Sequence, residues 1–275
     1  MSDADRLRHV SSRQNALVKE LRRTFHDGEC TAEGDCAIEG VRQIEEAIRS
    51  GLRVRAIFFS ESAKTLSQRL LPQISSHAEA LLLPDAIFAS AVATESPQGV
   101  AALVRVKQHS LEEVLSPPNP LVAVVAGVQD PGTLGTIVRS AEAFGASAVL
   151  LGEGTVSAFN SKAVRAAAGS LFRLPVIRVG LATAIAALRE RRLRLIATSS
   201  HKGTPLDAAD LTGALAFFIG SEGTGLPRAL MQQMDEIVSV PHSARVESLN
   251  AAVAASILFY ETSRQRKRFS PPGRE

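Results

Sequence analysis

The residues best suited to chemistry lie at three polar turns, each of which follows a hydrophobic run. Arg139 comes shortly after the first turn, at residues 129–135, and Glu222 lies between glycines in the second. Ser248 and Asn250 end the third, just before an alanine-rich stretch. A guanidinium stays charged and binds phosphate through two parallel hydrogen bonds, and a carboxylate in a glycine-flanked turn is free to orient such a group. The three turns are therefore a candidate ligand site.

Each of these residues also has an ordinary structural explanation. Arg139 could be an exposed helix residue paired with Glu142, which would contribute only about 0.2 to 0.5 kcal/mol. Glu222 could favour the start of the following helix through the helix dipole. Ser248 is well suited to cap the last helix, whereas Asn250 is expected at least one position inside it. The residue types alone leave these alternatives open.

The second half of the chain predicts a parallel sheet covered by helices on both faces. Its hydrophobic runs are near-continuous rather than alternating, which is typical of strands buried on both sides. They occur at residues 122–128, 148–151, 176–179, 193–198, 216–220 and 237–240. Ligands of such sheets bind beyond the carboxyl ends of the strands, where the polar turns are expected.

Motifs for several other α/β enzymes are absent from the sequence. It contains neither the G-x-G-x-x-G dinucleotide fingerprint nor a G-x-x-x-x-G-K-[ST] phosphate loop in this half. Ser221 is preceded by Ile219 two residues earlier, so it does not form a G-x-S-x-G nucleophile elbow. Dehydrogenases, P-loop NTPases and serine hydrolases are disfavoured.

The three turns resemble the signature motifs of the SpoU (TrmH-like) family, in matching order and spacing over about residues 121–261. The motifs read QDPGTLGTIVR at 129–139, FIGSEGTGLP at 218–227 and PHSARVESLN at 241–250. The resemblance implies an S-adenosylmethionine-dependent ribose 2′-O-methyltransferase acting on ribosomal or transfer RNA. It also implies the trefoil-knotted α/β methyltransferase fold, one of the rare exceptions to unthreaded chains.

The resemblance further implies roles for individual residues. Arg139, Glu222, Ser248 and Asn250 would form the catalytic constellation around the acceptor ribose. Family models make the arginine the base, but because a guanidinium keeps its proton near neutral pH we expect Arg139 to anchor phosphate and stabilise developing alkoxide. The residues expected to line the cofactor site are Thr198, Gly220, Val240 and Leu249. The first motif departs from the family pattern, since Thr133 stands where asparagine is usual.

The first half predicts a smaller α/β module. Helical patterns fall at 12–24, 39–50, 64–71 and 86–92, and strands at 55–60, 81–83 and 100–106. Segments 35–42 and 96–100 make it similar to the RNA substrate-binding domain of many family members. A proline-containing stretch follows, so the expected division is a substrate-binding domain at 1–107, a linker at 108–120 and a methyltransferase domain at 121–275.

Composition gives weaker indications. The formal net charge is +3 and the sequence pI about 9.1. Basic residues could bind RNA phosphates or could form a solvated surface. They gather near the N-terminus (Arg6, Arg8, Arg13, Lys19, Arg22 and Arg23) and in the tail (Arg264, Arg266, Lys267, Arg268 and Arg274). Cys30 and Cys36 complete no metal site and are expected to be reduced thiols. No apolar run reaches the roughly 20 residues that span a bilayer, and the charged start does not resemble a signal peptide, so a cytoplasmic protein is expected.

The sequence thus predicts an S-adenosylmethionine-dependent RNA 2′-O-methyltransferase, with 23S ribosomal RNA favoured. We expect a homodimer formed through the C-terminal domain, because small residues at 251–258 permit close helix approach and related enzymes pair in this way. A tRNA 2′-O-methyltransferase, an inactive RNA-binding ribosome-assembly or scaffold protein of the same fold, and an α/β enzyme acting on a small nucleotide remain as alternatives.

Overall fold

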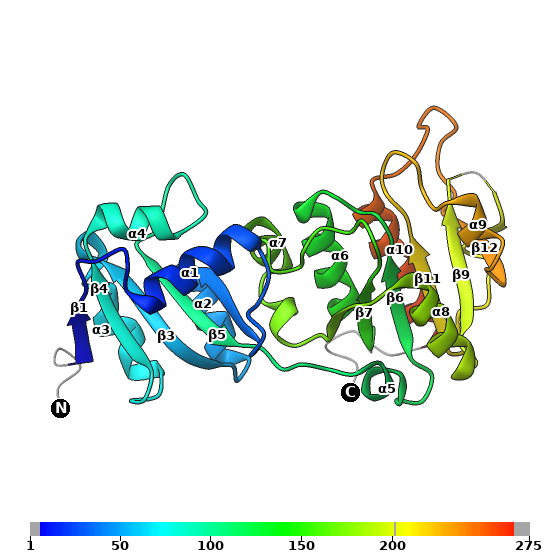
Figure 1. Ribbon diagram of the computed structural model, residues 1–275. Coiled ribbons are helices and arrows are strands. Elements are labelled where there is room, and N and C mark those ends of the chain that lie inside the picture. The colour runs from blue at the N-terminus through cyan, green and yellow to red at the C-terminus, as the bar shows by residue number, and fades with distance from the viewer. Residues whose placement is uncertain (1–5, 201, 267–275) are drawn as a thin grey trace, which may run out of the picture. The chain divides into compact units, whose positions relative to one another are not determined.

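The computed structural model describes residues 6–200 and 202–266, which form two compact units (Figure 1). The first unit comprises residues 1–108 together with 157–172, and the second comprises residues 109–156 and 173–275. None of the helices within the described residues is long and apolar enough to cross a bilayer. The domain boundaries expected from the sequence stay a prediction.

The first unit contains a mixed five-stranded sheet. The strands lie in the order β1-β4-β3-β5-β2. Strand β5 runs antiparallel to both of its neighbours, β3 and β2, whereas β4 runs parallel to β1 and β3. Its strands are β1 (Leu7–His9), β2 (Asp35–Glu39), β3 (Arg53–Ser60), β4 (Glu79–Leu83) and β5 (Val100–Arg105). Its α-helices are α1 (Ala16–Asp27), α2 (Val41–Arg49), α3 (Leu66–Leu70), α4 (Asp85–Ala91) and α7 (Ser161–Ala167). Helices α1 and α4 pack over one face through Leu21 and Phe88, which join a cluster with Phe58 of β3.

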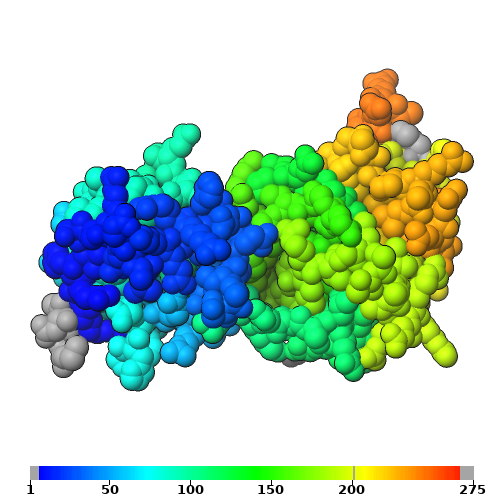
Figure 2. All heavy atoms as spheres, viewed as in Figure 1, coloured from blue at the N-terminus to red at the C-terminus, as the bar shows by residue number. Residues whose placement is uncertain are grey.

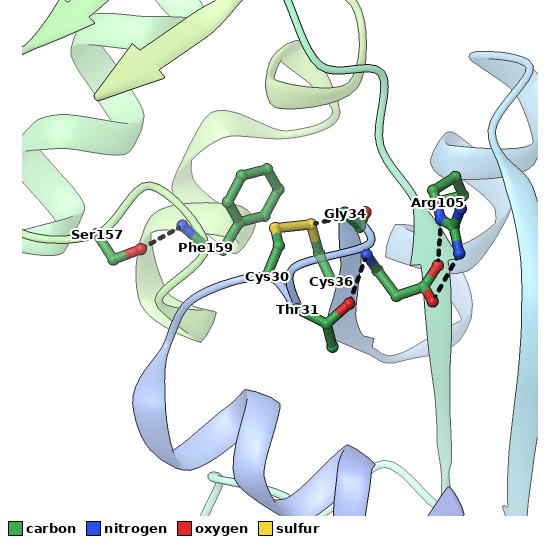
Figure 3. The surroundings of a disulfide bond; sticks show 8 residues. Cys30, Thr31, Gly34, Cys36, Arg105, Ser157 and Phe159 are labelled. Carbon is green, nitrogen blue, oxygen red and sulfur yellow. Dashed lines mark hydrogen bonds and ion pairs between the residues drawn. A yellow bond between two sulfur atoms is a disulfide. The ribbon is translucent and has the colours of Figure 1, made fainter. Parts of the chain in front are cut away.

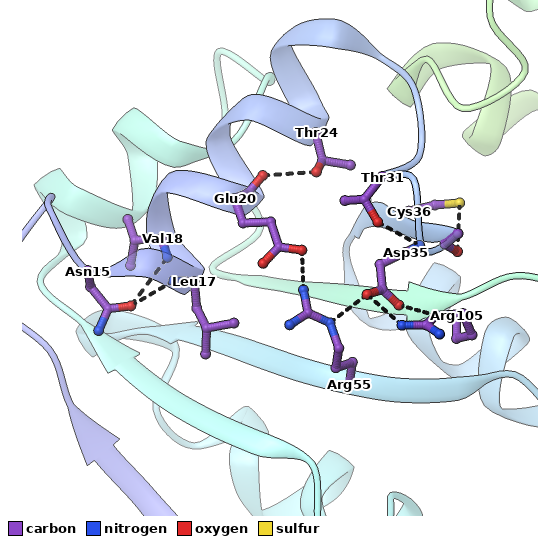
Figure 4. A network of polar contacts seen from close by, with 11 residues as sticks. Asn15, Leu17, Val18, Glu20, Thr24, Thr31, Asp35, Cys36, Arg55 and Arg105 are labelled. Carbon is purple, nitrogen blue, oxygen red and sulfur yellow. Dashed lines mark hydrogen bonds and ion pairs between the residues drawn. The ribbon is translucent and has the colours of Figure 1, made fainter.

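A chain of ion pairs ties α1 to the edge of this sheet. The side chain of Asp35 is only 3% exposed. Its two carboxylate oxygens accept hydrogen bonds from the Nε and Nη2 atoms of Arg105, at 2.6 and 3.0 Å. The Nε atom of Arg55 lies 2.7 Å from the same carboxylate, and the Nη2 atom of Arg55 donates to the carboxylate of Glu20 in α1 (Figure 4). Asp35 raises the pKa of the Arg105 guanidinium above its ordinary value. The buried carboxylate of Asp35 thus has two partners of opposite sign.

The expectation of reduced thiols is wrong, because Cys30 and Cys36 form a disulfide (Figure 3). The bridge spans a sequence separation of six and fastens the loop after α1 to the second residue of β2. The loop also has backbone hydrogen bonds, from Thr31 N to Asp35 O and from Gly34 N to Thr31 O, both 2.8 Å. Reduced thiols were expected because the two cysteines complete no metal site, and the distance between them in the fold, which decides whether a disulfide can form, is not visible in the sequence.

Much of the basic cluster near the N-terminus is engaged within the chain. Arg6 donates to the carbonyls of Leu71 and Ser75. The others with protein partners are Arg8 with Glu79, Arg22 with Ser90 and Arg23 with Asp27. In the tail, Arg264 pairs with Glu261 and Arg266 donates to three carbonyls, while Lys267, Arg268 and Arg274 lie outside the described residues. These contacts favour structural roles for several of the cations.

The second unit contains the expected parallel sheet, with seven strands in the order β10-β12-β9-β11-β6-β7-β8. All neighbours are parallel. The strands are β6 (Leu121–Val125), β7 (Ala148–Leu151), β8 (Val176–Arg178), β9 (Arg194–Ser199), β10 (Thr204–Pro205), β11 (Leu215–Ile219) and β12 (Glu236–Ser239). Every residue of β6, β7 and β11 is buried, as continuous apolar runs require when helices cover both faces.

Alternate side chains of β11 face the two helical layers. Phe218 joins a cluster with residues of α5 (Leu111–Leu115), α8 (Leu181–Glu190) and α9 (Arg228–Met231). Phe217 packs edge-on against Phe259 of α10 (Ala251–Gln265), with ring centroids 6.3 Å apart. Helix α10 packs beside α6 (Pro131–Ala143), and Ser140 and Ser256 share a hydrogen bond of 2.6 Å. These layers fix the ends of the strands where the polar turns begin.

Candidate active site

A cavity of about 500 Å³ lies at the carboxyl ends of β9, β11 and β12. Three segments line most of it: residues 198–200 at the end of β9, residues 219–226 at the end of β11, and, between β12 and α10, Val240, His242 and residues 247–249. The small side chains of Ala254 and Ala255 and the larger Leu258 form its α10 wall. The structure therefore brings the second and third turns together with the turn after β9.

The turn after β11 is held by contacts within itself. Gly225 has a left-handed φ of +64° and donates its N–H to the Ser221 carbonyl at 3.0 Å, while the Ser221 and Thr224 hydroxyls lie 2.9 Å apart. A Cβ on Gly220 would come within 2.6 Å of the Leu226 nitrogen. A side chain at Gly220 would thus push against the turn itself, which closes over the strand end.

All four residues expected to contact the cofactor line this cavity: Thr198, Gly220, Val240 and Leu249. The Thr198 hydroxyl donates to the Phe218 carbonyl at 3.2 Å, which links the ends of β9 and β11. Glu222 and Ser248 also line the cavity, and both are exposed. Glu222 lies six residues before α9, too far to act in the first turn of that helix.

Asn250, not Ser248, caps α10, so the expected helix start was misplaced. The Asn250 Oδ1 atom accepts from the N–H groups of Ala252 at 2.9 Å and Val253 at 3.3 Å. Asn250 is adjacent to the cavity-lining residues Leu249 and Ala251 but is not among them. Its oxygen has a structural task, which leaves the amide NH2 group for any other.

Arg139 lies away from the walls of this cavity. It is exposed on α6 and makes no hydrogen bond or ion pair with the residues that the structure describes. The suggested partner, Glu142, instead accepts from Arg173 through two bonds of 2.5 and 2.9 Å. The alternative of an Arg139–Glu142 pair is therefore wrong, and the guanidinium is available to a ligand.

Thr133 sits in the first turn of α6, 7% exposed. Its N–H donates to the Asp130 carboxylate at 2.7 Å, which makes Asp130 the cap of this helix. Thr133 does not line the cavity. The replacement of the family's usual asparagine by Thr133 thus lies at the buried first turn of α6, outside the cavity lining.

Comparisons with known proteins agree along the chain. The model of the SpoU rRNA Methylase family matches residues 120–260, and that of the MRM3-like substrate binding domain matches residues 15–102. The chain is 34% identical over 254 residues to 23S rRNA (guanosine(2553)-2′-O)-methyltransferase RlmP of Bacillus subtilis, over 92% of this chain and 98% of that protein. It belongs to the SpoU rRNA methylase family.

Further relatives agree with this assignment. An uncharacterized tRNA/rRNA methyltransferase of Mycobacterium tuberculosis is 33% identical over 242 residues, covering 85% of this chain and 75% of that one. The solved SpoU methyltransferase AviRb from Streptomyces viridochromogenes, in complex with AdoMet, superposes with a TM-score of 0.80 at 27% identity, over 92% of this chain and 99% of that one. The predicted family, fold class, enzyme class and cofactor are confirmed: the protein is an S-adenosylmethionine-dependent RNA methyltransferase.

The cavity fits the cofactor of a SpoU enzyme. Its volume is within the roughly 300 to 1,000 Å³ of small-molecule sites. Its charged lining residues include Glu222 and Glu247 but no lysine or arginine, which suits a ligand that carries a sulfonium. Apolar side chains such as Val238, Val240 and Leu249 can enclose an adenine ring, while the exposed strand ends provide backbone donors and acceptors.

Other cavity residues of this SpoU protein were not predicted from the sequence. His242 is half-buried in the wall, and its Nδ1 lies 2.7 Å from the Val240 carbonyl. Because a carbonyl only accepts, this nitrogen carries a proton and the ring orientation is set. Ser199, Ser200 and Glu247 also line the cavity. Their position directly after strands or within the third motif was the available signal.

Proposed function

We propose that the protein transfers the methyl group of S-adenosylmethionine to a ribose 2′-hydroxyl of 23S ribosomal RNA in the cytoplasm. The observation that carries this proposal is the convergence of three loops on one cavity with carboxylates and no cations in its lining. The similarity to RlmP over nearly the whole of both chains supports 23S rRNA as the substrate. The bound cofactor supplies an electrophilic methyl group, and the protein supplies alignment, which can lower the barrier by about 7 to 11 kcal/mol.

We propose that Thr198, Gly220, Val240 and Leu249 hold the cofactor. The side chain of Thr198 already bonds Phe218 O, so its contribution is to fix the strand ends rather than to donate to the cofactor. Glu222 lies on the cavity wall, where its carboxylate stabilises positive charge or orients the incoming sugar. Ser248 and the NH2 group of Asn250 bind the acceptor ribose beside it.

Arg139 is assigned to the phosphate next to the acceptor ribose and to the oxygen that gains negative charge. Support comes from its exposure and from the lack of any partner among the described residues. A guanidinium offers five fixed donors and does not lose its proton near neutral pH. It therefore stabilises the developing alkoxide electrostatically and does not act as the base; the hydroxyl proton leaves to solvent water as the oxygen takes the methyl group from sulfur.

The proposed assembly is a homodimer formed by the C-terminal domain, in which Arg139 serves the partner's cavity. Two observations support it. Arg139 does not line the cavity of its own chain. Val253 and Tyr260, 48% and 54% exposed, lie seven residues and hence two turns apart on one face of α10. Val253→Asp should produce monomers in light scattering, and an unchanged mass would contradict the dimer.

Each part of the chain has a proposed task in this function. Residues 1–107 bind the RNA substrate, residues 108–120 are the linker, and residues 121–275 form the methyltransferase domain with its trefoil knot. The match of residues 15–102 to a substrate binding domain model supports the first assignment. Helix α5 occupies part of the linker, capped by the Ser110 hydroxyl, which accepts from Glu113 N at 3.1 Å.

The test is methyl transfer by the purified full chain. With tritium-labelled S-adenosylmethionine, we expect label in unmodified 23S rRNA and none in tRNA or free nucleosides. Transfer to tRNA alone would favour the tRNA alternative. Cofactor binding in calorimetry without transfer to any RNA would contradict the enzymatic proposal and favour a scaffold protein.

A further inference from the structure

The loops around the cavity carry three cations that stand outside its lining. They are Lys202 after β9, Arg228 at the start of α9 and Arg245 between β12 and α10. Each is exposed, and none makes a side-chain hydrogen bond or ion pair with residues in the described ranges 6–200 and 202–266. We call these three residues the cationic rim.

Chain connectivity keeps the cationic rim close to the cavity. Lys202 and Arg228 follow the lining residues Ser200 and Leu226 by two positions, and Arg245 precedes Glu247 by two. Two residues of extended chain span at most about 7 Å, so each Cα lies within that distance of the cavity wall. Arg228 also lies three positions before Met231, a lining residue on the same side of α9.

Charge is therefore separated between the cavity and its surroundings. The lining contains Glu222 and Glu247 and no lysine or arginine, whereas the cations stand outside it on the same loops. The loop that bears Arg245, drawn in dark orange, projects from the surface in Figure 2. A cationic cofactor fits the inner carboxylates, and an approaching polyanion fits the outer cations.

Most other arginines of this unit have partners that neutralise them. Arg173 pairs with Glu142, Arg189 with Asp235, Arg191 with Glu112 and Arg194 with Glu236. Arg192 is exposed and has no such partner among the described residues. It precedes β9, so it lies at the amino ends of the strands, on the opposite side of the sheet from the cavity. At the carboxyl ends of the strands, the positive charges without partners are thus concentrated on the loops that form the cavity.

We infer that Lys202, Arg228 and Arg245 bind backbone phosphates of the RNA on either side of the methylated nucleotide. This inference rests on the proposed function and adds the residues that hold the strand over the cavity. Neutralising a phosphate releases condensed counterions, so binding weakens as salt rises, with a slope of about 0.7 to 0.9 per contact. The rim positions the RNA and carries no sequence information.

The experiment compares the full-length protein with a Lys202→Gln, Arg228→Gln, Arg245→Gln triple variant. Affinity for fluorescent, unmodified 23S rRNA is measured over a series of potassium chloride concentrations. We expect the triple variant to bind about ten- to a thousandfold more weakly at low salt, with the salt slope reduced by about two to three. Calorimetry should give unchanged affinity for S-adenosylmethionine.

Arg192→Gln is the control for position: it removes one positive charge at the amino ends of the strands, and it is compared with the single variant Arg228→Gln, which removes one from the cationic rim. An unchanged salt slope in the triple variant, or a loss in Arg192→Gln equal to that in Arg228→Gln, would overturn the inference. Methyl transfer by the wild type is measured in parallel. Absent wild-type transfer would contradict the proposed function, whereas normal transfer with an unaffected triple variant would contradict only the rim.

Discussion

Two arginine sites, one in each unit, have opposite surroundings. In the first unit, Arg55 and Arg105 converge on the buried carboxylate of Asp35, which is 3% exposed (Figure 4). In the second unit, Arg139 is exposed and has no partner among the described residues. A guanidinium that is neutralised within the fold contributes to folding, and one that is left without a partner is available to a phosphate. The comparison predicts that stability and activity depend on different arginine sites.

The largest effect is expected from Arg139→Ala. Loss of a donor to developing negative charge should lower kcat/KM about 10²- to 10³-fold, while the denaturation midpoint stays unchanged. Arg139→Lys keeps the charge but loses the planar pair of donors, so it should recover only part of the rate. Wild-type transfer by Arg139→Ala would contradict the assigned role.

Asp35→Ala should reverse this pattern. It leaves two guanidinium groups without their shared carboxylate, and since these are 30% and 45% exposed the cost is about 2 to 3 kcal/mol of unfolding free energy. Asp27→Ala, which removes an exposed pair with Arg23, should change stability by less than about 0.5 kcal/mol. Equal urea midpoints for the two variants would sink the distinction between them.

The disulfide should contribute to the same unit. Closing its short loop is expected to stabilise the fold by about 2 kcal/mol in the chain-entropy treatment. Dithiothreitol should lower the thermal midpoint of the wild type and leave that of a Cys30→Ala, Cys36→Ala double variant unaltered. If dithiothreitol changed the thermal midpoint of neither protein, the disulfide would not contribute to stability.

A smaller loss of stability than at Asp35 or the disulfide is expected at Asn250, which both caps α10 and is proposed to bind the acceptor ribose. Asn250→Ala removes the cap of α10 and should cost about 1 kcal/mol, whereas Asn250→Asp keeps a capping oxygen and should retain stability. Methyl transfer should fall in both variants, because both lack the amide NH2 group. Normal transfer by Asn250→Asp would reduce Asn250 to a cap.

Much of the fold was predictable because strands buried on both faces form continuous apolar runs in the sequence. The runs that became β6, β7 and β11 are apolar on both faces, so sequence alone indicated a covered parallel sheet. Strand β2 was missed because it begins and ends with Asp35 and Glu39, whose burial depends on distant partners. The two-residue β10 is too short to leave a pattern.

The site was predictable in part, for a related reason. Glu222 and Ser248 lie in the loops that follow β11 and β12, and the topology brings these loops to one cavity. Arg139 lies on a helix, so its distance from that cavity depends on packing that local patterns do not encode. The cap of α10 was misassigned because both Ser248 and Asn250 have the chemistry of a cap, and the geometry alone decides. The disulfide likewise depends on how close two loop positions come.

The most direct test of the central claim is a map of ribose methylation across RNA from cells with and without this protein. If the three loops hold the methyl donor beside an RNA ribose, a 2′-O-methyl group in 23S rRNA should disappear with the protein and return with the wild-type chain, but not with Arg139→Ala. Identical methylation maps in the two cell populations would contradict the account.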